Sequence, residues 1–153
     1  MRPVLITENV VTDLQALASA ALPCETGGIL VGVKARRTVW IVGAIELAED
    51  RSPGHYTVPA GATRPAVQRA REVIDPRVGY VGEWYSHIGD FGPSATDRAA
   101  MRAISWFVPS PVPGGPCLLL VRRTSAESVV RGYRARFPQL LPVKLHRTGP
   151  LPP

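Results

Sequence analysis

The chain has 153 residues, 45% of them hydrophobic and 20% charged, which is typical of one globular domain and excludes a fibrous or disordered protein. Its net charge of +6 is scattered in arginine pairs and along one predicted helix, without a long basic run interleaved with aromatics. We therefore predict a solvated basic surface, or one that attracts an acidic protein, and no nucleic-acid ligand. No apolar run approaches the ~20 residues of a membrane helix, so we predict no membrane association. A secretory signal is not apparent, and two cysteines are too few for a disulfide framework. We therefore predict a cytoplasmic protein.

The first predicted element is a helix over residues 8–22. Its apolar residues recur at the helical period, and Thr7 or Asn9 is a suitable N-cap. Two β-rich runs then flank the polar segment KARR. They predict a hairpin, with strands over 27–33 and 38–47, that is buried on at least one face.

The remaining segments complete the predicted fold. Prolines and glycines predict a loop over 50–63, with room for a short strand at 55–58. The other predicted elements are a helix over 64–74, a strand over 78–84, a helix over 94–107, and strands over 117–123 and 127–137. Frequent prolines near the end predict that residues 1–140 form the domain and 141–153 a proline-rich, irregular tail. This order of elements predicts an α/β (α+β) domain in which helices flank one curved, mostly antiparallel sheet.

The segment GEWYSHIGDFGPSATD, residues 82–97, gathers side chains that can hold a metal ion and assist hydrolysis. Hydrolysis of an amide at zinc needs about three protein ligands, an open position for water and a carboxylate base. Positions 85 and 87 point to the same side of an extended backbone, and the glycines and proline that follow let Asp97 meet His87. Ser94, at the predicted helix start, could donate a hydrogen bond to a developing oxyanion.

Each of these residues also has a structural explanation. Ser94 and Asp97 suit the N-cap and the first turn of a helix. His87 alone is more often a turn or core histidine than a ligand, and a salt bridge would account for Glu83. The combination of residues in this order favours a functional site.

This segment resembles the signature of the JAMM/MPN (JAB, Mov34) metallopeptidase family in its bacterial form. That signature is His-x-His, a short loop and Ser-x-x-Asp, with a glutamate upstream. His87, Ser94 and Asp97 match it in register, and PCETGGILVG at 23–32 resembles the upstream segment and supplies Glu25. The resemblance extends over roughly residues 4–137 and implies the JAB/MPN fold, which is cytidine-deaminase-like.

The resemblance implies a zinc-dependent isopeptidase or peptidase. Family members hydrolyse bonds at the C-terminus of ubiquitin or ubiquitin-like proteins, and some bacterial members process sulfur-carrier proteins. By the same resemblance, His87 and Asp97 would be ligands of Zn²⁺, Glu25 the general base and acid, and Ser94 the oxyanion donor. The expected partner is the tail of a ubiquitin-like or sulfur-carrier protein.

The segment departs from the family pattern in three ways. Tyr85 stands at the place of the first zinc histidine, Ile88 replaces a usual proline, and the loop before the serine is one residue shorter than usual. A phenol is a poor zinc ligand, because ionising it at pH 7 costs roughly 4 kcal/mol. His55 and Asp90 are candidate replacement ligands. Two functions therefore stay open: a zinc enzyme, and a catalytically silent binding or scaffold protein of the same fold.

Overall fold

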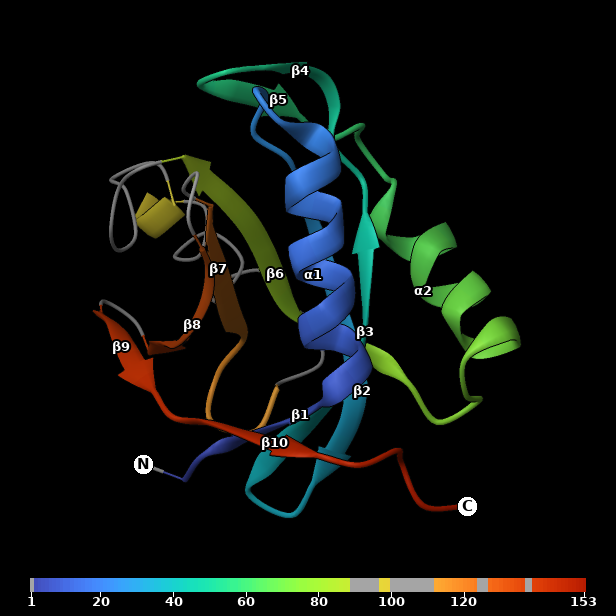
Figure 1. The fold of residues 1–153 in the computed structure, drawn as a ribbon. Helices are drawn as coiled ribbons and strands as arrows, with labels where there is room; N and C mark the ends of the chain where they lie inside the picture. The colour runs from blue at the N-terminus through green and yellow to red at the C-terminus, as the bar shows by residue number, and fades with distance from the viewer. Residues whose placement is uncertain (1, 89–96, 100–111, 124–126, 137–138) are drawn as a thin grey trace.

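The structure is a computed structural model of the 153-residue chain, and it describes residues 2–88, 97–99, 112–123, 127–136 and 139–153. Two helices and ten strands are named in the described part. In chain order they are β1 (Val4–Thr7), α1 (Glu8–Ala21), β2 (Gly27–Ala35), β3 (Thr38–Glu46), β4 (Glu49–Ser52), β5 (His55–Thr57), α2 (Thr63–Val73), β6 (Gly79–Ile88), β7 (Cys117–Arg123), β8 (Ser128–Arg136), β9 (Gln139–Val143) and β10 (Leu145–Thr148) (Figure 1).

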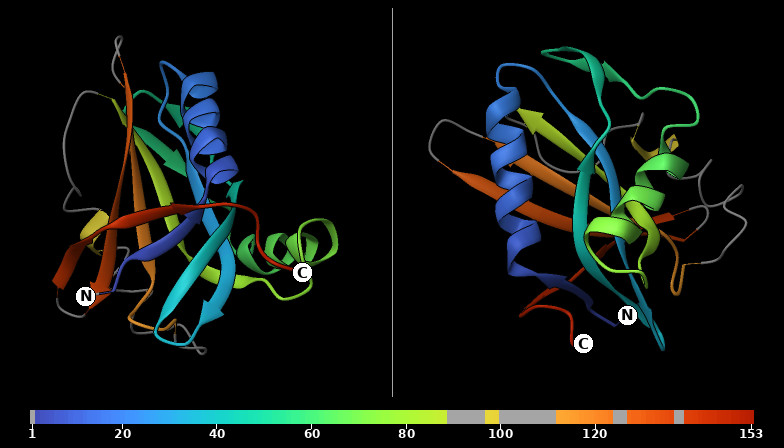
Figure 2. Two further views of the ribbon diagram at one scale, coloured as in Figure 1. Left: turned by 60° about the horizontal axis from the view of Figure 1, so that its bottom comes forward. Right: turned by 90° about the vertical axis from the view of Figure 1, so that its right-hand side faces the viewer.

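Eight of these strands form one curled, mixed sheet in the order β10-β1-β3-β2-β6-β7-β8-β9. Antiparallel neighbours outnumber parallel ones by four to three, so the prediction of a curved, mostly antiparallel sheet is confirmed. The two edge strands, β9 and β10, follow each other in the chain with only Lys144 between them. The sheet therefore curls back towards its own start (Figure 2).

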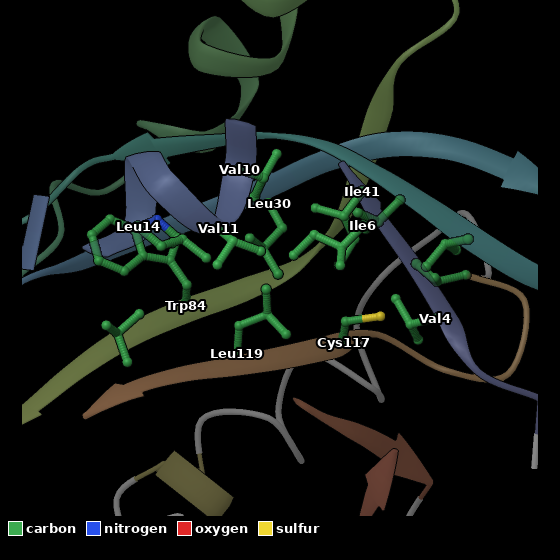
Figure 3. Packing of buried hydrophobic residues seen from close by; sticks show 14 of the residues in the cluster. Val4, Ile6, Val10, Val11, Leu14, Leu30, Ile41, Trp84, Cys117 and Leu119 are labelled. Atoms are coloured by element: carbon green, nitrogen blue, oxygen red, sulfur yellow. The ribbon is translucent and has the colours of Figure 1, made fainter. Parts of the chain in front are cut away.

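The helices cover opposite faces of this sheet. α1 lies inside the curl, where its apolar stripe packs against Trp84 of β6 and Leu119 of β7 (Figure 3). That stripe consists of the buried residues Val10, Val11, Leu14 and Ala18. On the other face, Val67 and Ala70 of α2 pack against apolar residues of β2 and β3. Since both faces of the central strands are covered, most of their apolar residues are removed from water.

The local predictions match the structure where the sequence signal is strong. The helices predicted over 8–22 and 64–74 are present as α1 and α2, and Thr7 occupies the N-cap of α1, although its side chain makes no capping hydrogen bond. The short strand predicted at 55–58 corresponds to β5, which pairs with β4 in a small hairpin. Of the helix predicted over 94–107, residues 97–99 are helical and the rest lies outside the described residues.

The prediction of an irregular tail over 141–153 is wrong for residues 141–148, which form the end of β9 and all of β10. β10 pairs in parallel with β1, a strand that the sequence analysis also missed. The Val4 N–H donates to the carbonyl of Lys144 at 2.9 Å. Pro142 is tolerated in β9 because that strand lies at the edge of the sheet. No helix in the described part of the chain is long and apolar enough to cross a membrane.

Candidate functional site

Strand β6 presents the side chains of the candidate site on one face. Trp84 and Ser86 are buried on the core face, whereas Glu83, Tyr85 and His87 alternate with them and are only partly buried. This strand lies so close to β7 that a side chain at Gly82 would collide with the backbone carbonyl of Cys117. The glycine at the start of the GEWYSH segment therefore fixes where the site residues lie.

His87 lies between two carboxylates. Its Nε2 is 2.9 Å from Oδ2 of Asp97, and its Nδ1 is 3.5 Å from Oε1 of Glu25. Asp97 comes from the helical residues 97–99, and Glu25 from the segment between α1 and β2. The hydrogen bond with Asp97 and the charges of both carboxylates raise the pKa of His87, against the opposing effect of burial. The structure thus brings Glu25, His87 and Asp97 together, while Ser94 and Asp90 lie outside the described residues.

Glu25 is held in place by hydrogen bonds that the sequence analysis did not foresee. Its own N–H donates to the carbonyl of Ser52 in β4 at 3.1 Å. The next N–H, of Thr26, donates to Oγ of Ser86 at 2.8 Å, and the Ser86 N–H donates back to the Thr26 carbonyl at 2.8 Å. Ser86, on the core face of β6, thereby ties Glu25 to the strand that carries His87. The only sequence signal for this role is a small polar residue at a buried position.

Tyr85 is packed against a second tyrosine. Its ring centroid is 6.1 Å from that of Tyr56 in β5, and the rings are tilted by 43°. Gly27 makes room for this contact, since a side chain there would collide with the Tyr56 hydroxyl. Burial is the main cause that raises the pKa of both phenols, and nearby carboxylates raise it further. Both hydroxyls therefore stay protonated at neutral pH.

Tyr56 was missed by the sequence analysis, and its only signal was the weak strand at 55–58. His55 is exposed on β5, where neighbouring side chains point to opposite sides of the strand. Tyr56 points towards Tyr85, and its neighbour His55 therefore points to the other side of β5. The structure does not bring His55 to His87.

Glu83 lies further back along the same face of β6. Its Oε1 accepts a hydrogen bond from the Tyr80 hydroxyl at 3.2 Å, so its partner is a phenol rather than the basic residue of the salt bridge considered from the sequence. Burial raises the pKa of Glu83 to about 7, and the Tyr80 hydrogen bond only partly opposes this.

The described residues do not fit a catalytic zinc ion. Such an ion takes three protein ligands and leaves one position open. Nε2 of His87 and Oδ2 of Asp97 face each other and could share an ion, but the place of the third ligand in the motif is taken by Tyr85, a partly buried, neutral phenol. Among the residues that the structure describes, no group of three His, Cys, Asp or Glu side chains is placed to hold a metal ion.

Comparisons with known proteins identify the family and the fold. Residues 7–132 match the family model described as prokaryotic homologs of the JAB domain. The solution structure of protein DSY2949 from Desulfitobacterium hafniense is similar with a TM-score of 0.74 and 20% sequence identity, over 97% of this chain and 94% of that chain. At this identity the likeness concerns the fold alone. None of the curated proteins compared with the chain matches it significantly.

Proposed function

The chain belongs to the prokaryotic JAB family, and from this premise we propose that it is a silent member that binds the C-terminal tail of a ubiquitin-like or sulfur-carrier protein without cleaving it. Family members of the JAMM type act on such tails, which supports the choice of partner. The side chains of His87 and Glu25 keep 17% and 19% of their surface exposed, so a chain end can reach them. We place this function in the cytoplasm, where free cysteines stay reduced.

The observation that carries the proposal is the environment of Tyr85. A neutral phenol is a poor substitute for a zinc-binding histidine, because it must first lose its proton. Its ring is also held against Tyr56, so moving it towards His87 would break a buried aromatic contact. Without the ion, His87 serves as a bridge between Glu25 and Asp97.

A JAMM-type zinc peptidase is the second candidate function. It is favoured by one specific observation, the convergence of Glu25 and Asp97 on His87. In that case Glu25 would be the general base and acid, and Ser94 the oxyanion donor, as the family resemblance implies. Zinc would supply the activated water of such an enzyme.

Binding and cleavage assays separate the two functions. The probe is a bacterial sulfur-carrier protein with a short reporter peptide fused to its C-terminus, compared with the same protein lacking its tail. We expect calorimetry to detect binding that requires the tail, and gel electrophoresis to detect no release of the reporter in the presence of Zn²⁺. Glu25→Gln should leave the affinity within about twofold, because it keeps the size of the side chain. The matched control is Glu49→Gln on exposed β4. Reporter release that disappears in Glu25→Gln and with a chelator would replace the proposal by the peptidase.

A further inference from the structure

A groove with a volume of about 1160 Å³ lies between α2 and strands β2 and β6. Its floor includes Tyr80 and Glu83, which share a face of β6 with Tyr85 and His87 but lie nearer the start of the strand. Figure 2 shows α2 lying over this face of the sheet. The volume exceeds the ~300–1,000 Å³ of most small-molecule pockets, which favours a segment of polypeptide as its occupant.

The groove has a cationic wall. Arg64, Gln68 and Arg71 recur at intervals of four and three residues, so they line one side of α2. Nε of Arg71 donates to the carbonyl of Val78 at 2.9 Å, which fixes the guanidinium at the wall and leaves its other nitrogens available. Neither Arg64 nor Arg71 is paired with a carboxylate among the described residues, whereas Arg77 is paired with Asp75 at 2.8 Å. The wall therefore carries two uncompensated positive charges.

The floor of the groove is partly apolar and contains one carboxyl group. Val33 and the ring of Tyr80, which are partly buried, contribute the apolar surface, and the carboxyl is that of Glu83. A nucleic-acid backbone needs several cationic contacts along a continuous row of phosphates, whereas the wall offers two, Arg64 and Arg71. An extended peptide has a better match, because alternate side chains can offer carboxylates to the wall and apolar groups to the floor.

We propose that this groove binds an acidic, extended peptide segment of a protein partner, with its carboxylates held by Arg64 and Arg71 and its apolar side chains on Val33 and the ring of Tyr80. Guanidinium groups are well suited to this role, since they bind carboxylates in a bidentate manner. The proposal goes beyond the tail-binding function, because none of these residues contacts Glu25, His87 or Asp97 in the described structure.

Fluorescence anisotropy tests the proposal with a short labelled peptide in which Glu alternates with Ala and Leu. The reference peptide has Gln in place of each Glu. We expect the Glu peptide to bind at least about tenfold more tightly at low salt, and this advantage to shrink at ~0.3 M salt. Arg64→Gln should weaken binding by about three- to fivefold, as should Arg71→Gln. Arg64 is the decisive position, because Arg71 also supports the backbone at Val78.

The control variant is Arg69→Gln, which removes the same charge from an exposed position of α2 that does not line the groove. It should bind the Glu peptide like the unmodified protein. Equal affinity for both peptides would overturn the proposal, and so would an equal loss in Arg69→Gln and Arg64→Gln. Tighter binding of a single-stranded RNA of the same net charge would also overturn it. The assay contains no carrier-protein tail and no zinc, so its outcome is separate from that of the proposed function.

Discussion

Glu83 illustrates how a single buried carboxyl links the candidate site to the stability of the fold. Its pKa rises from an ordinary 4.5 to about 7 because burial disfavours the charged form. The folded protein therefore binds this proton more tightly than the unfolded chain does. The stabilising contribution is complete below pH ~4.5 and is lost as the pH rises through ~7.

We predict that Glu83→Gln removes this contribution to the pH dependence. Gln keeps the size of the side chain and accepts a hydrogen bond from Tyr80, but it has no charge to bury. At pH 8 the variant should exceed the unmodified protein in free energy of unfolding by about 2 kcal/mol, and near pH 4.5 the two should be similar. Urea denaturation at both pH values measures the difference, with Glu49→Gln as the exposed control. A constant difference between pH 4.5 and 8 would show that Glu83 ionises normally.

At the scale of elements, the contact between β6 and β7 positions the whole GEWYSH segment. Gly82 is paired with Cys117, and a side chain there would collide with the backbone of the neighbouring strand. We predict that Gly82→Ala lowers the free energy of unfolding by more than about 2 kcal/mol, because backbone atoms cannot give way as side chains do. Gly54→Ala is the matched control, since nothing lies within 4 Å of its added carbon. Equal melting temperatures of the two variants would contradict this view of the strand pair.

The elements also explain what the sequence could and could not predict. Helices α1 and α2 and strands β2, β3, β6, β7 and β8 have strong local signals, and they appear within a few residues of their predicted bounds. Strands β1 and β10 are short, and they depend on pairing with strands far away in the sequence: β1 with β3 and β10, and β10 with β1. Such pairing leaves no local pattern, and prolines around β10 suggested an irregular tail instead.

The positions of the candidate site residues were also predicted only in part. The approach of Asp97 to His87 was predicted from the glycines and proline between them. The approach of Glu25 followed only from the family resemblance, because Glu25 is 62 positions away from His87 in the sequence. The contacts of Tyr56 with Tyr85 and of Thr26 with Ser86 depend on the curl of the sheet and on the β4–β5 hairpin. Neither contact has a motif that a single sequence reveals. The structure shows where Glu25, His87 and Asp97 lie, and the roles predicted for them, for Ser94 and for Asp90 stay predictions.

For the whole molecule, β10 brings the C-terminal segment back to the first strand. Leu145 packs against the main core cluster, which also contains Ile6 and Val11. We predict that deleting residues 145–153 lowers the free energy of unfolding by more than about 3 kcal/mol, because β1 loses a neighbour and this part of the core becomes exposed. His146→Ala, at an exposed position of β10, should have little effect. Guanidinium denaturation compares the three proteins, and a deletion as stable as the full chain would mean that β10 does not support the sheet.

The proposed function depends on Tyr85 leaving a JAB-type site without its third zinc ligand. Zinc content per chain, measured by inductively coupled plasma mass spectrometry after dialysis against micromolar Zn²⁺, tests it most directly. We expect far less than one zinc per chain for the unmodified protein and for Tyr85→Phe, and close to one for Tyr85→His, which restores three protein ligands. One tightly bound zinc in the unmodified protein would contradict it.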